Sequence, residues 1–262
     1  MTKVSIATWN VNSIRARLEV LLKWLKSNNP DILLLQELKA QEENIPREDI
    51  EDLNYNFITY GQKAYNGVAI LSKFPVSDIT FNLPNFKEDI QARYIEAFIS
   101  IANKGIRIGS IYAPNGNPVN TEKYDYKIQW LKKFYDHAKK LLEYEEYTIL
   151  GGDFNICPTR LDAADENLLS NDAIFTKEVK TLYKSTINLG YYDVFRNINP
   201  TSPGFTYWDY GQSFKNDIGV RIDHFLMSPY ALDSVKKVYV DKVPRAWQKP
   251  SDHTPLFVEI EL

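Results

Sequence analysis

Carboxylate, amide and histidine side chains recur at the ends of strand candidates in this chain of 262 residues. Glu37 ends the apolar run DILLLQE, Asp153 follows YTILGG, and Asp223 lies inside VRIDHFLM. In open α/β folds, ligands bind outside strand ends, where loops present side chains on a rigid base. Hard oxygen donors suit Mg²⁺ or Mn²⁺, and such an ion would neutralise charge on a phosphoryl group. The pattern therefore predicts a metal-dependent site for phosphodiester hydrolysis.

The segment SDHTPL places His253 directly before the last strand candidate. A lone carboxylate such as Asp223 is costly to bury unless it is paired with a positive charge. Of the other histidines, His224 should point to the opposite face of its strand. His137 lies on a helix candidate, where we expect it at the surface. We therefore predict a buried ion pair between Asp223 and His253.

Each remaining candidate has a role that its chemistry permits. Asp153 would take a proton from water, and Asn155 would position that water or the phosphate. Glu37 would hold the metal ion with help from Asn10 or Asp252. Asp252 should face away from its histidine neighbour, toward the metal or a backbone amide. The sequence has neither a Gly-x-Ser-x-Gly element nor a Walker loop, so direct attack by water is expected. Taken singly, an Asn or Asp at a strand end is most often a turn former or cap.

The elements that carry these residues alternate between strands and helices. KVSIATWN predicts a strand, and SIRARLEVLLKWLKSNN predicts a helix with Ser13 as its N-cap. DILLLQE then predicts a buried strand. NGVAILS, YIEAFISIA and IRIGSIYAP follow with little room for helices between them, so we expect these neighbours to pair antiparallel.

The second half continues this alternation. Apolar spacing predicts helices over 124–142 and 175–189, the second stopping at Gly190. Between them, YTILGGDFN predicts a strand followed by a Gly-Gly turn. Two halves that each mix strands with helices predict an α/β fold, namely a four-layer sandwich of two mixed β-sheets flanked by helices. Because the sequence shows no linker or repeat, residues 1–262 are expected to form a single domain.

Charge and composition narrow the choice of partners. The formal net charge of −3 gives no overall basic excess, so DNA binding would need a local basic surface or a bound metal ion. A single cysteine, Cys157, rules out an internal disulfide and suits a reducing compartment. No apolar run reaches the roughly 18 residues of a membrane span, and the N-terminus lacks a signal-peptide pattern. We expect a cytoplasmic monomer with no membrane contact.

Eight segments occur in an order that resembles the exonuclease III family of DNA-repair nucleases: TWNVNSIRAR, DILLLQELK, NGVAILS, IYAPNG, GGDFNICPTRLD, GFTYWDY, VRIDHFLMS and SDHTPL. The resemblance implies the deoxyribonuclease I-like sandwich of the wider endonuclease/exonuclease/phosphatase superfamily. It also implies Mg²⁺-dependent hydrolysis of the phosphodiester 5′ to abasic sites in double-stranded DNA. Removal of blocked 3′ ends and 3′→5′ exonuclease action are further activities of the family.

The resemblance assigns three groups of residues by position. The catalytic group comprises Asp153, Asn155, His253, Asp223 and Tyr112, with the tyrosine as a phosphate contact. The metal group comprises Glu37, Asn10 and Asp252. The DNA-binding group comprises Arg15, Asn12, Asn115, Tyr65, Tyr207, Trp208 and Val220.

Three residues of the DNA-binding group bear on substrate choice. Tyr207 and Trp208 would form the walls of a pocket for the flipped-out abasic sugar, because a missing base lowers the cost of extrusion. Alternatively, both are ordinary core aromatics. Val220 stands where close relatives often carry Trp or Leu, and a smaller wall would loosen the discrimination between abasic and intact nucleotides.

Two other classes of protein share parts of this pattern. QE, GDFN and SDH also occur in phosphoinositide phosphatases, sphingomyelinases and RNA deadenylases, whereas SIRAR, IYAPNG and GFTYWDY favour the DNA-repair nucleases. A phosphatase of lipids or inositol phosphates would need membrane-facing apolar loops or additional basic residues. A non-catalytic relative would have lost Glu37, Asp153 or His253, and all three are present. The alternative that stays open is a phosphoesterase of the same superfamily that acts on RNA or on a lipid or inositol phosphate.

Overall fold

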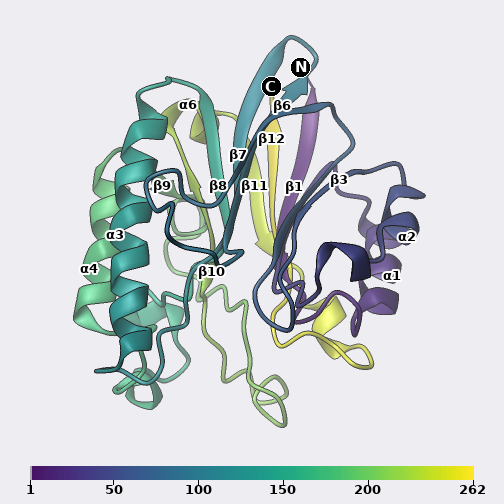
Figure 1. Ribbon diagram of the computed structural model, residues 1–262. Helices are drawn as coiled ribbons and strands as arrows, with labels where there is room; N and C mark the ends of the chain where they lie inside the picture. Colours follow the sequence, from purple (N-terminus) through teal and green to yellow (C-terminus); the bar gives the residue numbers. More distant parts are fainter. Residues whose placement is uncertain (1) are drawn as a thin grey trace.

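Two six-stranded mixed sheets stack face to face in the computed structural model, which describes residues 2–262 (Figure 1). The first sheet has the spatial order β11 (Val235–Val240), β12 (Leu256–Glu261), β1 (Lys3–Asn10), β2 (Ile32–Gln36), β4 (Val68–Ser72) and β3 (Asn56–Tyr60). The second has the order β5 (Val76–Phe81), β6 (Tyr94–Ile101), β7 (Lys104–Tyr112), β8 (Tyr147–Asp153), β10 (Asp223–Met227) and β9 (Tyr192–Asp193). Strands β1 and β2 run parallel, as do β7 and β8, and the remaining pairs are antiparallel.

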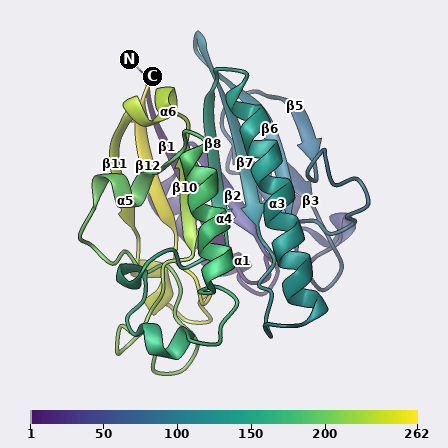
Figure 2. The same ribbon diagram turned by 90° about the vertical axis from the view of Figure 1, so that its left-hand side faces the viewer.

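Helices cover both outer faces of the stacked sheets. The helices α1 (Leu18–Asn28) and α2 (Arg47–Glu51) lie on the first sheet, and α3 (Glu122–Leu142) and α4 (Lys177–Asn188) lie on the second (Figures 1 and 2). Two short helices, α5 (Val194–Ile198) and α6 (Pro229–Asp233), complete the set together with four 3₁₀ turns, η1 (Glu42–Asn44), η2 (Arg160–Asp162), η3 (Glu166–Leu169) and η4 (Val243–Ala246). The predicted four-layer sandwich is confirmed. Within residues 2–262, no helix combines the length and apolarity needed to cross a membrane.

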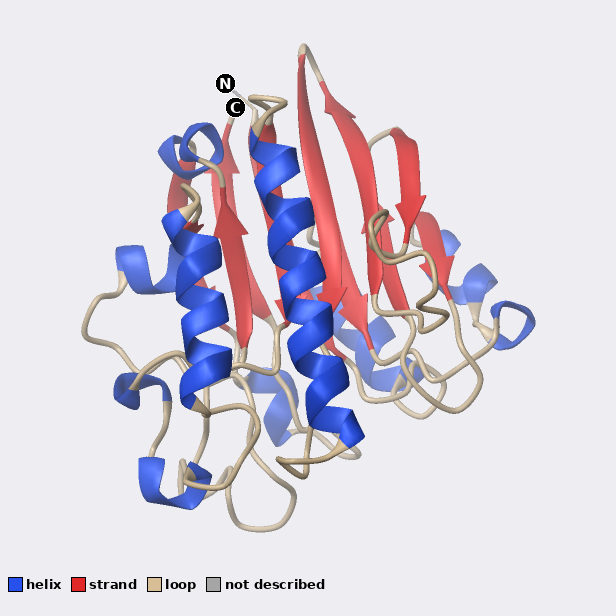
Figure 3. Ribbon diagram, turned by 60° about the vertical axis from the view of Figure 1, so that its left-hand side comes forward, coloured by secondary structure: helices blue, strands red, loops and turns tan. Residues whose placement is uncertain are grey.

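The inner strands β2, β4 and β10 are buried along their whole length because each sheet is covered on both sides, whereas the edge strand β5 is largely exposed. One face of β2 packs into the core between the sheets through Ile32 and Leu34, and its other face packs under α1 through Leu33 and Leu35. Burial on both faces explains the continuous apolar run in the sequence. These inner strands carry few polar side chains except at their ends, and Figure 3 shows that many of the connecting loops gather at the lower end of the molecule.

The predictions for a helix start, a strand pairing and the exposure of a histidine were wrong. Helix α1 begins at Leu18, four residues beyond the position that a Ser13 cap would give, because Ser13 adopts a left-handed backbone with φ of 88°. Strand β4 pairs with β2 and β3 in the first sheet, so it does not continue into an antiparallel pair with β6. His137 is buried, since its ring nitrogen lies 2.8 Å from a carboxylate oxygen of Glu96 between α3 and the second sheet.

The predicted Gly-Gly turn is part of strand β8. Gly151 and Gly152 continue the strand to Asp153. A Cβ on Gly151 would lie 2.4 Å from the Phe225 ring, and one on Gly152 would lie 2.0 Å from the carbonyl oxygen of Ile111. The two glycines are therefore required by the close approach of neighbouring strands, which a reading of Gly-Gly as turn chemistry misses. The two long helices begin and end within two residues of their predicted limits.

Candidate active site

Five strands from the two sheets bring the candidate residues to one end of the sandwich. Asn10 is the last residue of β1, and Glu37 directly follows β2, its parallel neighbour. In the second sheet, Tyr112 ends β7 and lies opposite Asp153, which ends β8. Because β10 is antiparallel to β8, its first residue, Asp223, lies opposite Asp153 as well. The site is thus built where both sheets end, on the side of the molecule opposite the two chain termini (Figure 1).

His253 and Asp223 form the predicted buried pair. The Nδ1 atom of His253 lies 2.9 Å from Oδ2 of Asp223, and Nε2 lies 3.7 Å from Oδ2 of Asp153. Burial by itself would lower the pKa of His253, but the charges of Asp223 and Asp153 outweigh it and raise the pKa to about 10. The imidazole is therefore a cation at neutral pH. His224 points away from this pair, as predicted, and its ring bonds the carbonyl oxygen of Ile156 at 2.8 Å.

Asp153 is the most strongly perturbed carboxyl group of the site. Its Oδ2 accepts a hydrogen bond from Nδ2 of Asn10 at 2.9 Å, and its Oδ1 accepts one from the backbone N–H of Asn155 at 2.8 Å. Burial is the largest cause of its raised pKa, and nearby Asp223 adds to the rise. The opposing charge of His253 leaves the pKa of Asp153 at about 7. A carboxylate with a pKa near neutrality is well matched to take a proton from water.

Glu37 is held from two sides. Its Oε1 accepts a hydrogen bond from Nδ2 of Asn10 at 2.8 Å, and its Oε2 pairs with Nζ of Lys39 at 2.6 Å. Burial would raise the pKa of Glu37, but the charge of Lys39 and the two hydrogen bonds outweigh it and lower the pKa. Glu37 therefore stays ionised. Tyr112 lies beside it, and burial together with the charge of Glu37 raises the pKa of that phenol well above its usual range, which keeps it a hydrogen-bond donor.

The donor set fits an oxygen-seeking divalent cation. Asp153, Asp223 and His253 offer ligand atoms that all lie within 4.8 Å of one another. Oδ1 of Asp223 is buried without a hydrogen-bond partner among residues 2–262, and such an acceptor calls for a cation or a water molecule. Because His253 is protonated and bonded to Asp223, its nitrogens are poor ligands, and the carboxylates are the better donors.

Asp252 faces away from His253, as predicted, but its partner is a side chain. Its Oδ1 accepts a hydrogen bond from Nδ2 of Asn12 at 3.0 Å. Oδ1 of Asn12 in turn accepts one from Lys39 at 2.7 Å. Asp252 is thus connected to Glu37 through Asn12 and Lys39 and does not bond it directly. Sequence reasoning missed Lys39, although its position two residues after Glu37 in the same loop was the available signal.

The other predicted DNA-contacting residues differ in where they lie. Asn115 bonds the side chain of Asn155 at 3.2 Å, and the Tyr207 ring packs against His253 with a centroid separation of 5.0 Å. Arg15 and Tyr65 are exposed, the latter by 70%. The contacts thus place Asn115 and Tyr207 beside the candidate catalytic residues, whereas Arg15 and Tyr65 are placed by their exposure alone.

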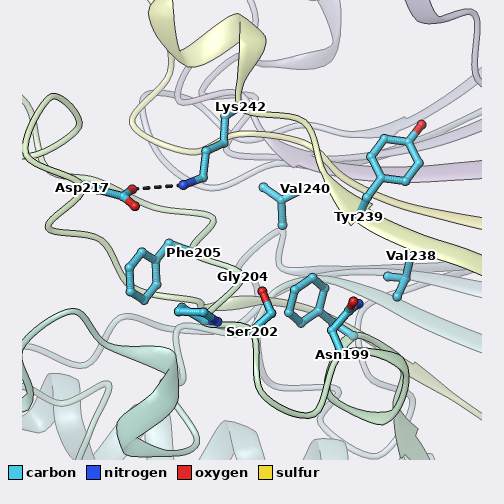
Figure 4. A pocket seen from close by; sticks show the side chains of 11 residues that line it. Asn199, Ser202, Gly204, Phe205, Asp217, Val238, Tyr239, Val240 and Lys242 are labelled. Atoms are coloured by element: carbon cyan, nitrogen blue, oxygen red, sulfur yellow. Dashed lines mark hydrogen bonds and ion pairs between the residues drawn. The ribbon is translucent and has the colours of Figure 1, made fainter.

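The prediction that Trp208 lines the sugar pocket is wrong, because its side chain is fully buried and cannot line an exposed pocket. Its Nε1 donates to Asp217 at 3.1 Å, and Asp217 pairs with Lys242 at 3.0 Å. This pair borders a separate cavity of about 330 Å³ between β11 and residues 199–205 (Figure 4). Val220 is half-buried against an apolar cluster that includes Ile222, and its backbone bonds that of Tyr207. The sequence could not separate Tyr207 from Trp208, since adjacent aromatics look alike until their packing is known.

A buried ion network fixes the strand that carries Asp223. Arg221 is completely buried, with Nε 2.6 Å from Asp162 and NH2 2.8 Å from Asp193. These bonds connect η2 and β9 to the start of β10. Burial and the neighbouring Arg221 charge lower the pKa of His224 to about 4, so this histidine is neutral. The network consequently fixes the start of β10, which carries Asp223, and His224 adds no charge to the site.

Comparisons with known proteins agree with this geometry. A family model described as the Endonuclease/Exonuclease/phosphatase family matches residues 7–253. The chain is 32% identical over 266 residues to exodeoxyribonuclease III of Haemophilus influenzae, a match that covers 97% of this chain and 98% of that protein. The structure of an AP endonuclease from Archaeoglobus fulgidus is similar with a TM-score of 0.92 and 35% identity, over 99% of this chain and 100% of that chain. A 3′ phosphatase from Neisseria bound to a product DNA hairpin gives a TM-score of 0.93 and 33% identity, again over 99% of this chain and 100% of that chain.

Proposed function

We propose that this chain, which belongs to the endonuclease/exonuclease/phosphatase family and is a DNA-repair nuclease of the exodeoxyribonuclease III type, hydrolyses the phosphodiester 5′ to abasic sites in duplex DNA. The observation that carries the proposal is the group of Asp153, Asp223 and His253 beside the Asn10–Glu37 pair. This group places a base, a fixed cation and oxygen ligands around one point. That combination is what in-line attack of water on a phosphodiester requires.

The roles of the side chains follow from their protonation. Asp153, with a pKa of about 7, takes the proton of the attacking water. His253 is kept cationic by Asp223 and faces the phosphoryl oxygens, where negative charge grows in the transition state. Asn155 orients the water or the phosphate, and Tyr112 donates a hydrogen bond to a phosphate oxygen. Asp153 and Tyr112 act from the ends of β8 and β7, which limits the reorganisation that the reaction needs.

The proposed metal ion is Mg²⁺, with Mn²⁺ as a substitute. Glu37 and Asn10 would hold it, and Asp252 would support the site through Asn12 and Lys39. When bound, the ion supplies positive charge against the phosphate. Glu37 suits this role because it stays ionised and presents hard oxygen atoms.

The proposed DNA surface consists of the side chains around the catalytic group: Arg15, Asn12, Asn115, Tyr65, Tyr207 and Val220. We propose that Tyr207 and Val220 bound the pocket for the abasic sugar, and that the small Val220 admits 3′-terminal nucleotides as well. Cleaning of blocked 3′ ends and 3′→5′ trimming would follow from the same site. We further propose that residues 1–262 act as one domain, as a monomer and in the cytoplasm.

Cleavage of a duplex with one abasic-site analogue tests the proposal. Nicking should need Mg²⁺, stop with EDTA and fall in Asp153→Ala by about 10²–10⁴-fold, the usual contribution of a positioned base. An intact duplex with a recessed 3′ end, run beside it, separates nicking from trimming by product length. An RNA strand and an inositol phosphate serve as competing substrates. Preferential hydrolysis of either would replace the DNA-repair assignment with the alternative within the superfamily.

A further inference from the structure

Lys127 of α3 is a lysine with no solvent exposure, directly behind the catalytic loops. Its Nζ donates hydrogen bonds to the carbonyl oxygens of Asn115 at 2.9 Å and Asn155 at 2.6 Å. Asn115 lies in the loop after β7, and Asn155 lies in the loop after β8. A single ammonium group therefore joins the two loops that carry candidate catalytic side chains.

The surrounding chain is shaped to admit this lysine. Gly116 has a left-handed backbone with φ of 85°, and a Cβ at this position would lie 2.6 Å from Cδ of Lys127. A side chain here would push the lysine stem away from the two carbonyl groups. The glycine of the IYAPNG segment is therefore explained by the passage of Lys127 beneath it.

A lysine is an expensive choice for this position. Burial is the main cause that lowers the pKa of Lys127 to about 7, and the charges of Asp153 and Asp172 oppose this effect. Within residues 2–262, no carboxylate forms an ion pair with the ammonium. A buried lysine amino group that is held only by carbonyl groups has lost its contacts with water without gaining an ion pair, so its place behind the site points to a role in function.

Asn155 is the residue through which Lys127 reaches the chemistry. Its backbone is left-handed with φ of 49°, a conformation that asparagine adopts more readily than most residues, and Lys127 bonds its carbonyl oxygen there. Its backbone N–H bonds Oδ1 of Asp153, and its side chain bonds the carbonyl oxygen of Ala113. Any rotation about the Asn155 backbone therefore moves both its own amide and the hydrogen bond that orients Asp153.

We infer that Lys127 is a positioning residue of the active site, which sets the orientation of Asn155 and Asp153 by binding the carbonyl groups of both loops. This inference rests on the proposed nuclease activity and deepens it. Lys127 is fully enclosed and touches no substrate. We therefore expect the larger effect on turnover of bound DNA, because among the proposed DNA-binding residues only Asn115 lies in a loop that Lys127 holds.

The test is Lys127→Met, which keeps the apolar stem and removes the ammonium, assayed on the abasic duplex. We expect kcat to fall by about 10–100-fold, the scale of a small misplacement of catalytic groups, with KM unchanged within about twofold. In an Asn155→Ala background, Lys127→Met should cost less than about threefold, since residues that act as a unit are not additive. An equal loss in both backgrounds, or an unchanged kcat in the folded variant, would overturn the inference.

Tyr191→Phe is the matched control for general disturbance of α3. Tyr191 is buried, and its hydroxyl bonds the carbonyl oxygen of Ala138 on the same helix at 2.9 Å, away from the site. The kcat of Tyr191→Phe should equal that of the wild type. A fall in kcat as large as that of Lys127→Met would show that the docking of α3, and not Lys127 itself, determines turnover. If Lys127→Met does not fold, Lys127→Gln, which keeps one donor group, replaces it. The same result is expected, namely a lower kcat with an unchanged KM.

Amide hydrogen exchange provides a readout that needs no substrate. Residues 113–117 and 154–157 should exchange faster in Lys127→Met than in the wild type, while the rest of α3 stays protected. Unchanged exchange in both loops would overturn the inference. Absence of cleavage by the wild type, with exchange altered as expected, would instead refute the proposed nuclease activity and leave the positioning role standing.

Discussion

Replacing Asp223 by asparagine should remove the charge that keeps His253 protonated. The two groups are buried, and their nearest atoms are 2.9 Å apart. At an effective dielectric constant of about 20, opposite charges at that separation attract by roughly 6 kcal/mol. The rise of the His253 pKa from 6.5 to about 10 corresponds to roughly 5 kcal/mol, at about 1.4 kcal/mol per pH unit. Asp223 is the largest of the charges that raise the pKa of His253, and Asp153 adds to it against the opposing effect of burial.

The direction in which kcat depends on pH follows from the need for a protonated His253. In the wild type, His253 loses its charge only as the pH rises through about 10, so it is a cation across the neutral range. In Asp223→Asn, burial still lowers the pKa, and Asp153 at 3.7 Å opposes it only in part. At about pH 8 the variant imidazole should be neutral, and kcat should fall by about 10²–10³-fold, the cost of losing one stabilising donor. The ratio of variant to wild-type kcat should rise as the pH is lowered.

The assay is a pair of kcat profiles from about pH 6 to about pH 9, combined with an NMR titration of the imidazole of His253. His224 is the internal control, because its pKa of about 4 is set by burial and Arg221 and should not change. A variant that retains full kcat at the alkaline end would refute the reasoning. So would a His253 that titrates in Asp223→Asn as it does in the wild type.

Three further predictions concern stability, metal binding and specificity. Asp193→Ala leaves Arg221 buried with one carboxylate partner fewer and should lower the free energy of unfolding by about 3–5 kcal/mol, measured by urea unfolding; an unchanged midpoint would contradict the importance of this network. Glu37→Gln should raise the Mg²⁺ concentration for half-maximal cleavage by about 10–100-fold while DNA binding in EDTA stays unchanged, and an unaltered Mg²⁺ requirement would exclude Glu37 as a ligand. Val220→Trp should increase the ratio of abasic nicking to 3′ trimming, read from product lengths, and a lower ratio would argue against Val220 as a pocket wall.

Sequence patterns were sufficient for the layers of the fold and for the buried pair of Asp223 and His253. The sandwich was predictable because the spacing of apolar residues along each strand and helix follows from which of its faces are buried. Asp223 and His253 were connected because a buried carboxylate needs a cation and the alternatives faced elsewhere. Each inference combines a local sequence pattern with a physical rule: burial sets the apolar spacing for the fold, and a buried carboxylate needs a cation for the pair.

Other features were beyond the sequence because they depend on distant contacts. His137 is buried by its bond to Glu96, 41 residues away, which no helical pattern reveals. The glycines of β8 are required by the side chain and carbonyl group of neighbouring strands. Lys127 looks like an ordinary helix lysine until its ammonium is seen between the loops of Asn115 and Asn155.

Single-turnover cleavage of the abasic duplex by Asp153→Ala, His253→Ala and the double variant tests the central claim, that the strand ends form one hydrolytic unit. Each single variant should lose at least about 10²-fold in rate, and the double variant should be little slower than the worse single variant, because groups that act together are not additive. A single variant with the full wild-type rate, or losses that multiply in the double variant, would contradict the claim.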